Sequence, residues 1–340
     1  MSNSITNNPG SRKVLITTAY QDPEPITSFL ALAALDRIKK YELVTDPEAA
    51  DIIFFIENSH YHGDYFFSEL KKNHLVRKYP NKVFMYNSHD MPWLILPGLY
   101  ACMPKRYFDK SFMAASPYIE VINPYINCDF TNEPKFLFSF YGALSSIPRR
   151  KLPGIRHQRG RVLVSTVGMY GEHKPEDLQL QYAQLLSDSK FVLCPKGIGT
   201  SSIRLFETLQ AGRVPVIIAD DWVAPMGPDW EQFAVFIREK DVYKIPEILE
   251  LEEHHWNTKS RLARKAWEDF FAPDVMFSYM IDVISCFKEN YTTISRSAQI
   301  VHYMPYIRYV FRALVIRRIK KITQLTKRFF SKDLKRFAAN

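Results

Sequence analysis

A short glycine-containing loop and the helix expected after it carry residues that could bind a phosphate group. The loop 196–200 (KGIGT) follows an apolar run at 191–194 and leads to Ser201 and Ser202, which are residue types that favour helix N-termini. A helix that begins through a glycine loop at a strand's carboxyl end presents free backbone N–H groups to an anion. These residues therefore predict a phosphate site.

Two charged residues extend this site. Arg204 and Glu207 are three residues apart, so they share one face of the expected helix and can both face a cleft. An arginine suits a diphosphate and a carboxylate suits ribose hydroxyls, which together describe a nucleotide-sugar site. The alternative is a surface ion pair, which would contribute little to stability.

The sequence of this region resembles the signature motif of a known family. The helix is expected to end at Gly212, and residues 214–219 form an apolar run typical of a buried parallel strand. The pattern CPKGxGxSSxRLFExLxAGxVPVIIxD resembles the signature of exostosin-like glycosyltransferases, and the likeness is densest over residues 136–249. It implies the GT-B fold, with two Rossmann-like domains facing across a cleft. It also implies transfer of a sugar from a nucleotide sugar with inversion.

A second segment is expected to reach the same donor. Gly142 and Ala143 follow an apolar run and precede Arg149 and Arg150. In the family pattern a glycine turn followed by a basic residue contributes to donor binding, and we favour Arg149 over Arg150 for this role. The alternative is that both arginines, beside Lys151, form a solvated loop.

The resemblance also assigns roles within the first segment. It implies that Glu207 accepts hydrogen bonds from the donor's ribose, and that Lys196 and Gly197 shape the wall of the donor pocket. Helix N-termini and basic side chains such as Arg204 would then stabilise the negative charge of the departing diphosphate.

An inverting transfer needs one base to deprotonate the acceptor hydroxyl. That base should come from the first half of the chain, at the carboxyl end of a strand. The run 82–86 ends just before His89 and Asp90. We rank Asp90 first, ahead of His89 and of Glu57, which ends another apolar run.

The acidic and histidine residues do not form a recognisable metal motif. The sequence has no DxD triplet, the motif of metal-dependent transferases. We expect Asp220 and Asp221 to lie at a strand end and in a turn rather than to bind a cation. Asp229 has no other acidic residue next to it. His60 and His62 lack a third ligand, so exposure is the simpler interpretation. We therefore expect no metal or other cofactor requirement.

Apolar runs alternate with amphipathic stretches along the chain, which predicts an α/β protein with parallel sheets. In the first half the expected strands are 13–17, 51–56, 82–86 and 119–122, with helices at 26–40 and 68–78. In the second half they are 136–141, 161–165, 191–194, 214–219 and 234–237, with helices at 177–186 and 202–211. A break at 123–134 separates two Rossmann-like halves. The predicted domains are therefore 1–130 on the acceptor side, 131–290 on the donor side, and a tail at 291–340.

The composition is that of a folded protein, since 46% of the 340 residues are hydrophobic and 24% are charged. Four cysteines without a CxxC pair favour a reducing compartment. The polar start MSNSITNNPGSR has no apolar core of a secretory signal, and no apolar run of about 20 residues occurs. We therefore expect a bacterial-type enzyme of the cytoplasm.

The net charge of +9 is concentrated in the tail. Residues 291–340 hold twelve lysines and arginines against one acidic residue, Asp333, whereas the other residues hold 33 basic and 35 acidic groups. A nearly neutral body argues against a nucleic-acid-binding protein.

The tail has an amphipathic pattern. On a helical wheel one stripe collects seven apolar residues, although Arg318 also falls there: Ile307, Phe311, Leu314, Val315, Ile322, Leu325 and Phe329. A basic amphipathic helix suits an anionic membrane surface. The alternative is a helix packed on the body with a solvated basic face.

These observations predict an inverting glycosyltransferase that uses a UDP-sugar to extend a surface polysaccharide. The acceptor would be a glycan or lipid-linked glycan, and the enzyme would sit on the inner face of the membrane. One alternative is a GDP-sugar transferase such as a fucosyltransferase. Another is a non-catalytic scaffold that binds glycan or nucleotide and is tethered to the membrane.

Overall fold

The computed structural model describes residues 12–20, 23–57, 63–64, 66–90, 92–119, 123–165 and 175–289, and single positions between 297 and 319. The chain divides into two compact units. The first contains Met1–Pro92 and Leu96–Thr293, and the second contains Trp93–Ile95 and Ile294–Asn340. Both sheets of the described residues belong to the first unit.

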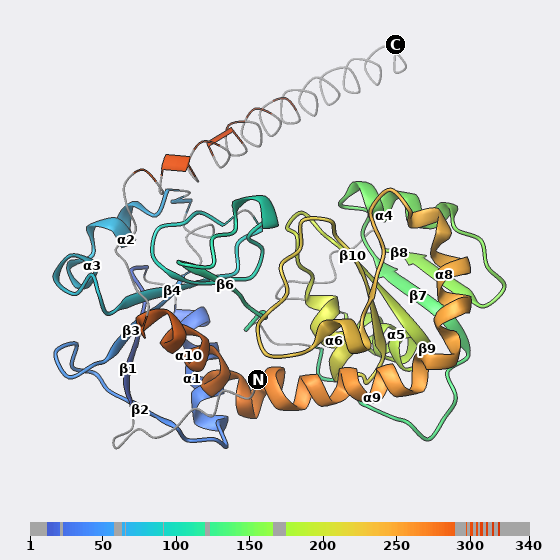
Figure 1. Ribbon diagram of the computed structural model, residues 1–340, viewed down its shortest axis with the longest axis horizontal. Coiled ribbons are helices and arrows are strands. Elements are labelled where there is room, and N and C mark those ends of the chain that lie inside the picture. The colour runs from blue at the N-terminus through green and yellow to red at the C-terminus, as the bar shows by residue number, and fades with distance from the viewer. Residues whose placement is uncertain are drawn as a thin grey trace, which may run out of the picture. The chain divides into compact units, whose positions relative to one another are not determined.

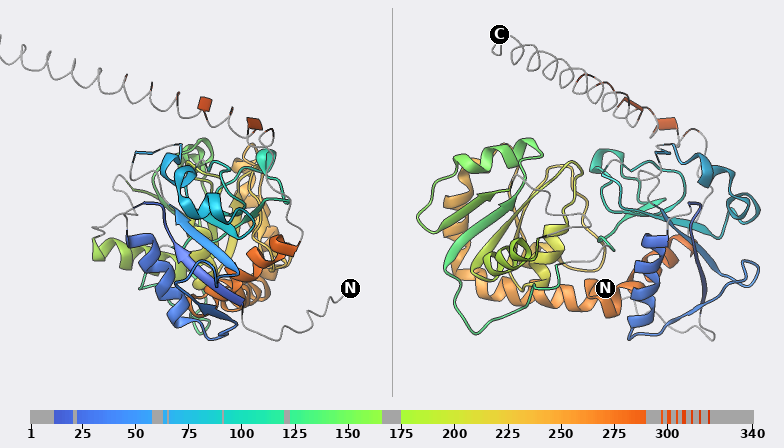
Figure 2. Two further views of the ribbon diagram at one scale, coloured as in Figure 1. Left: turned by 90° about the vertical axis from the view of Figure 1, so that its left-hand side faces the viewer. Right: turned by 180° about the vertical axis from the view of Figure 1, so that it is seen from behind.

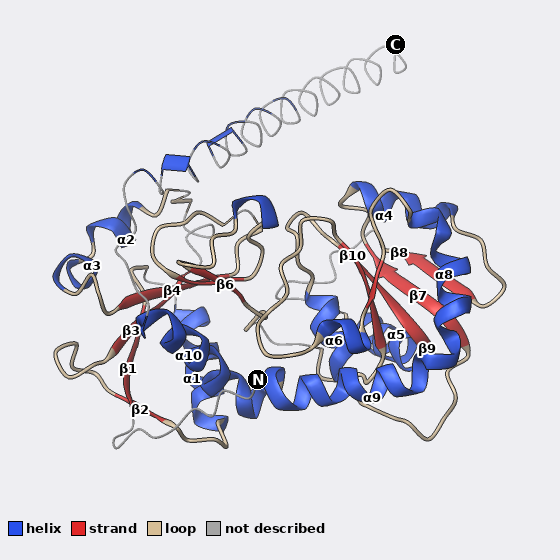
Figure 3. Cartoon of the chain, in the orientation of Figure 1, coloured by secondary structure: helices blue, strands red, loops and turns tan. Residues whose placement is uncertain are grey.

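The first half of the large unit is a six-stranded parallel sheet in the order β2-β1-β3-β4-β5-β6 (Figures 1 and 3). Its central strands are fully buried, since their sequences IIFFIE and VFMYN place apolar side chains on both faces. The strands are β1 Arg12–Thr17, β2 Tyr41–Leu43, β3 Ile52–Glu57, β4 Val83–Asn87, β5 Gly98–Tyr100 and β6 Met113–Ala115. The helices are α1 Pro23–Leu35, α2 Ser68–Lys72, α3 His74–Lys78 and the short η2 Lys105–Tyr107.

The first half differs from the sequence prediction in three places. Strands β2, β5 and β6 have three residues each, too few to give a periodic pattern. The single helix expected at 68–78 is two helices, because Asn73 leaves the helical conformation and caps α3 by accepting the N–H of Leu75 at 2.9 Å. The strand expected at 119–122 is not confirmed, since Ile119 lies outside every strand and residues 120–122 are not described.

The second half is a five-stranded parallel sheet in the order β11-β10-β9-β7-β8. The strands are β7 Phe136–Gly142, β8 Gly160–Val164, β9 Ser189–Pro195, β10 Val214–Ile218 and β11 Val235–Phe236. The helices are α4 Ile147–Lys151, η3 Leu152–Gly154, α5 Glu176–Ser187, α6 Ile203–Gln210, α7 Trp230–Phe233, η4 Val242–Lys244, α8 Ile245–Glu252, η5 Glu253–His255, α9 Trp256–Ala266, the π-helical η6 Trp267–Phe271 and α10 Pro273–Glu289.

The last helix of this unit returns to the first half of the chain. Beyond α9 and η6, α10 packs on α1 (Figure 2), where the rings of Phe29 and Phe277 lie 5.6 Å apart. Ser278 also donates a hydrogen bond of 2.8 Å to Asp36. The sequence boundaries place α10 in the donor-side domain, but its side chains complete the core beside the first sheet.

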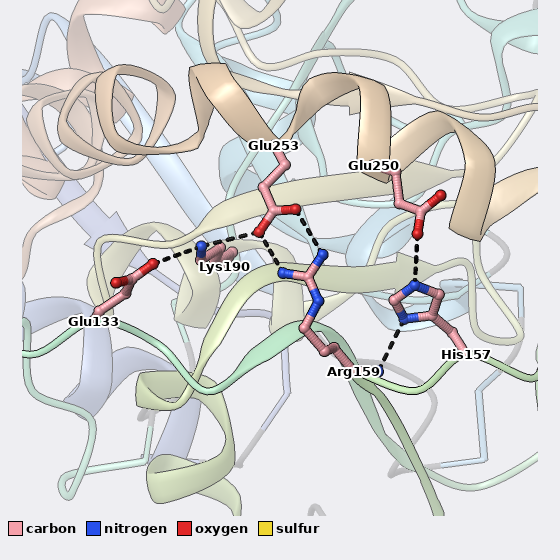
Figure 4. Close-up of polar contacts among 6 residues, drawn as sticks. All are labelled: Glu133, His157, Arg159, Lys190, Glu250 and Glu253. Carbon is pink, nitrogen blue, oxygen red and sulfur yellow. Dashed lines mark hydrogen bonds and ion pairs between the residues drawn. The ribbon is translucent and has the colours of Figure 1, made fainter.

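A cluster of charged side chains ties η5 to the amino edge of the second sheet (Figure 4). Glu253 accepts two hydrogen bonds from Arg159, at 2.5 and 2.7 Å, and one from Lys190 at 2.9 Å. Lys190 also binds Glu133 at 2.8 Å. The hydrogen bonds from Arg159 are the main reason that the pKa of Glu253 is lowered to about 2. This cluster links η5 to the start of β8 and to β9, at the edge opposite the carboxyl ends of the strands.

Among the described helices, none is by itself long and apolar enough to cross a membrane. The helical run Val242–Phe271 and the helix Pro273–Phe287 meet the length and composition criteria only together, with a bend of 68°. The apolar residues of α10 belong to the buried core.

Candidate functional site

The candidate site lies at the carboxyl edge of the second sheet. Neighbouring strands β7 and β9 end at Gly142 and Pro195, and the segments after them lead to α4 and α6. Because parallel strands end at the same edge, the two predicted donor-binding segments come together there.

Arg204 is the centre of this cluster. Its side chain is only 1% exposed, and Nη2 donates a hydrogen bond of 2.5 Å to the carbonyl of Tyr141. Its guanidinium lies 4.6 Å from the centroid of the Phe140 ring. A Cβ atom added to Gly142 would lie 2.6 Å from Nη2 of Arg204, so the glycine is needed for this close approach.

Arg149 reaches the same cluster from α4. Its guanidinium lies 5.9 Å from the Phe140 centroid, and Nε donates to the carbonyl of Lys196 at 3.0 Å. Nε and Nη2 also lie 3.3 and 3.2 Å from the carbonyl of Pro195. A Cβ on Gly197 would lie 3.3 Å from Nη2, so this glycine also faces Arg149. Two guanidinium groups thus share one aromatic ring.

The segment that carries Arg149 is a helix rather than the solvated loop considered as an alternative. Ser146 caps α4 by accepting the N–H of Arg149 at 3.4 Å, and its hydroxyl donates to the carbonyl of Lys196 at 2.8 Å. Arg150 is exposed, whereas Arg149 is partly buried. The helix therefore separates the two arginines and directs Arg149 to the loop.

The loop and the helix start have the predicted order, with one difference. Ser201 and Ser202 are buried, and Ser202 occupies the N-cap of α6 in an extended conformation. Its hydroxyl makes no capping hydrogen bond to the helix, contrary to the usual role of an N-cap serine. Lys196 pairs with Glu239 at 2.6 Å, which neutralises its charge at the side of the loop.

Glu207 and Arg204 are both buried, so they do not form the exposed ion pair considered as an alternative. Glu207 is 2% exposed, and its Oε2 accepts a hydrogen bond of 2.7 Å from the hydroxyl of Tyr182. The sequence prediction missed Tyr182, which lies on the buried face of α5 among apolar residues. Nothing in its local pattern distinguishes it from a core residue.

Asp90, the first-ranked base, contacts the glycine loop. Its Oδ1 accepts the backbone N–H of Gly199 at 3.1 Å. A Cβ on Gly199 would lie 2.7 Å from that oxygen and 2.5 Å from Sγ of Cys102, so no larger residue fits. Thr200 adds a hydrogen bond of 3.0 Å to the carbonyl of Cys102. The predicted base and donor loop are therefore neighbours.

The other two base candidates differ in surroundings. His89 is half-buried, and its backbone N–H binds the side chain of Asn87 at 2.8 Å. Glu57 is 1% exposed, and its oxygens accept hydrogen bonds from the N–H of Ala19 at 2.8 Å and the hydroxyl of Thr18 at 3.3 Å. Glu57 thus anchors the loop after β1.

The burial of Glu57 predicts a pH-dependent stability. Loss of hydration raises its pKa from 4.5 to about 8, so the folded state favours the protonated carboxyl. Its contribution is present below about pH 4.5 and is lost as the pH rises through 8. We expect the free energy of unfolding of the wild type, relative to Glu57→Gln, to fall by up to about 1.4 kcal/mol per pH unit in this window. Denaturant titrations at several pH values measure this difference, and parallel curves for both proteins would contradict it.

No motif for a metal appears among the described residues, where no group of three or more histidine, cysteine, aspartate or glutamate residues could hold an ion. Asp220 and Asp221 lie in a turn after β10, as expected, and Asp229 precedes α7. His60 and His62 lie outside the described residues.

The structure is an α/β protein with two parallel sheets, as expected for the GT-B architecture, and the arginine cluster lies at the carboxyl edge of the second sheet. Residues 56–251 match the model of the Exostosin GT47 domain. That match covers more than half of the chain, which therefore belongs to the exostosin GT47 family.

Curated relatives agree with this assignment. The chain is 28% identical over 208 residues to the Exostosin-1 homolog of Caenorhabditis elegans, covering 52% of this chain and 54% of the relative. It is 44% identical over 70 residues to a probable glucuronosyltransferase of Oryza sativa subsp. japonica, and 43% identical over 70 residues to a probable beta-1,4-xylosyltransferase of Arabidopsis thaliana; each match covers 20% of this chain and 17% of the relative. The chain thus spans about half or less of the length of these relatives. A solved glycosyltransferase from Rickettsia africae aligns over 83% of this chain and 99% of its own, but a TM-score of 0.40 at 8% identity is too low to add support.

Proposed function

We propose that this protein transfers a sugar from a nucleoside-diphosphate sugar to a glycan acceptor. The observation that carries the proposal is the convergence of Arg204 and Arg149 on Phe140, beside two glycines that admit a close approach. Guanidinium groups bind phosphate oxygens through several N–H donors in a fixed planar arrangement. Two of them at one sheet edge suit the two phosphates of a diphosphate.

The surrounding groups fit the chemistry of transfer. As the bond from sugar to diphosphate breaks, negative charge accumulates on the leaving phosphate, and fixed positive groups stabilise it. Glu207 would accept hydrogen bonds from the ribose. Asp90 would take the proton of the acceptor hydroxyl in a single inverting displacement. These groups need no metal for their roles, so we expect transfer to continue in the presence of EDTA.

The donor is proposed to be a UDP-sugar, because the sequence of the loop and helix start resembles the exostosin motif rather than the motif of GDP-fucose transferases. Thermal unfolding with UDP, GDP and CMP sugars tests this choice. A ligand present at 100 times its Kd stabilises the folded state by about 2.7 kcal/mol, which raises the Tm measurably. We expect UDP and its sugars to do so. A shift with GDP alone would favour the fucosyltransferase-type alternative, and binding without turnover across all donors would favour the scaffold.

We also propose that the tail attaches the enzyme to the cytoplasmic face of a membrane, where a lipid-linked glycan would be the acceptor. Seven apolar residues of the described tail are helical, 39% to 69% exposed, and follow one another at intervals of one to four residues: Ile300, Val301, Met304, Ile307, Phe311, Val315 and Ile319. The other predicted stripe residues, from Leu314 to Phe329, lie outside the described residues. Exposed apolar side chains together with eleven net positive charges suit anionic lipid.

Vesicle flotation of the full chain tests the tail. We expect flotation with vesicles of phosphatidylcholine and phosphatidylglycerol, little with phosphatidylcholine alone, and a decrease with added salt. Phe311→Asp should abolish it, because a charge replaces an exposed apolar side chain of the stripe. Leu251→Asp is the matched control, since Leu251 is 75% exposed on α8. Equal flotation of both variants would contradict attachment through the tail, and no flotation of the wild type would contradict the membrane proposal.

A further inference from the structure

Tyr182 contacts both charged residues of the candidate donor site. It is 2% exposed, and its hydroxyl donates a hydrogen bond of 2.7 Å to Oε2 of Glu207. Its ring centroid lies 6.0 Å from Cζ of Arg204. One side chain from α5 therefore contacts both Glu207, the proposed ribose-binding carboxylate, and Arg204, the proposed diphosphate-binding arginine.

The hydrogen bond has a directional consequence. A buried carboxylate requires donors to offset its lost hydration, and an O–H donor to an ionised oxygen is among the stronger hydrogen bonds. Because Oε2 accepts this hydrogen bond, the rotation of the Glu207 carboxylate about the Cγ–Cδ bond is fixed. Tyr182 is itself held in place, since its ring lies against that of Tyr141, 6.4 Å away, and its neighbours Ala183 and Leu186 are buried.

We propose that Tyr182 is a positioning residue that holds the Glu207 carboxylate in the orientation that accepts the ribose hydroxyls of the donor. The inference rests on the proposed function, and it adds a determinant of specificity. A binding site that forms a hydrogen bond with a ligand hydroxyl discriminates against an analogue without that hydroxyl, provided that the carboxylate that accepts the bond is held rigidly. Tyr182 supplies that rigidity, so it sets the preference for ribonucleotides over 2′-deoxyribonucleotides. The preference concerns the sugar of the nucleotide and not its base.

Calorimetric titration of the full chain tests the role. The ligands are UDP, GDP and their 2′-deoxy counterparts, and the variant is Tyr182→Phe. We expect the affinity for the ribonucleoside diphosphate to fall about tenfold or more, since a hydrogen bond to a charged group is lost. The affinity for the 2′-deoxy ligand should change much less, so the ratio between the two should shrink.

Two further variants separate positioning from a structural effect. Tyr279→Phe is the matched control, because it removes a buried tyrosine hydroxyl that donates a hydrogen bond of 2.8 Å to the carbonyl of Met226, and neither residue belongs to the donor site; it should leave the ratio unchanged. Glu207→Gln alone should also shrink the ratio, and adding Tyr182→Phe to it should have little further effect. This dependence distinguishes positioning from a general loosening of the fold.

The outcomes distinguish this inference from the proposed function. If a nucleoside diphosphate binds but Tyr182→Phe weakens the ribo and deoxy ligands equally, or weakens neither, the positioning role is wrong and the donor site stands. Additive losses in the double variant would also overturn the positioning role. If no nucleoside diphosphate binds the wild type, both the proposed function and this inference are wrong.

Discussion

Asp90→Asn is expected to lower kcat by about 10²- to 10⁴-fold, the usual contribution of a general base, while the Kd for the donor stays close to that of the wild type. Asparagine keeps an oxygen that can accept the N–H of Gly199, which lies 3.1 Å from Oδ1 of Asp90. The loop therefore stays in place and only the basicity is lost. Single-turnover rates and UDP titrations measure the two quantities.

Two comparisons make this result specific. Asp90→Ala removes the hydrogen bond as well as the base, so it should weaken donor binding in addition to lowering the rate. His89→Gln should preserve most of the rate if Asp90 is the base. A fully active Asp90→Asn enzyme would exclude Asp90, and loss of turnover in His89→Gln alone would assign the role to the histidine.

Gly142→Ala is expected to weaken UDP binding about tenfold or more, the loss typical of a displaced hydrogen-bonded charge. The added Cβ would lie 2.6 Å from Nη2 of Arg204, closer than real Cβ contacts, and the buried guanidinium must move. Its hydrogen bond to the carbonyl of Tyr141 would then be strained or broken. Titration calorimetry with UDP gives the affinity directly.

Gly154→Ala is the matched control for this prediction. A Cβ at Gly154 would lie 3.4 Å from the Tyr243 ring, an ordinary contact, in the same half of the chain. It should leave UDP binding unchanged. Equal affinity in Gly142→Ala and the wild type would show that Arg204 does not bind the donor.

Local sequence was enough to predict the strand, loop and helix of the first proposed donor segment. Strand β10 is a continuous apolar run and β9 contains one at 191–194, and the loop after β9 contains glycines and serines of the kind that suit an anion site. The order of the second proposed segment could also be predicted, because Gly142 ends β7 and Arg149 lies on α4, the next helix along the chain. These features depend on residues close together in the chain.

Features that depend on distant residues could not be predicted. Tyr182 meets Glu207 across 25 residues, and its position on α5 looks like that of any core aromatic residue. The bond from Gly199 to Asp90 spans 109 residues and joins the two halves of the unit. The packing of α10 on α1 was missed for the same reason. Each of these contacts is set by tertiary packing rather than by local preference.

Hydrogen exchange of the full chain with and without UDP tests most directly whether the donor binds at the carboxyl edge of the second sheet. Backbone amides in residues 142–150 and 196–207 are predicted to exchange more slowly with UDP. Residues 157–160, at the opposite edge near Arg159, should be unaffected and serve as an internal control. Protection confined to the first sheet, or no protection by any nucleoside diphosphate, would contradict the proposed donor site.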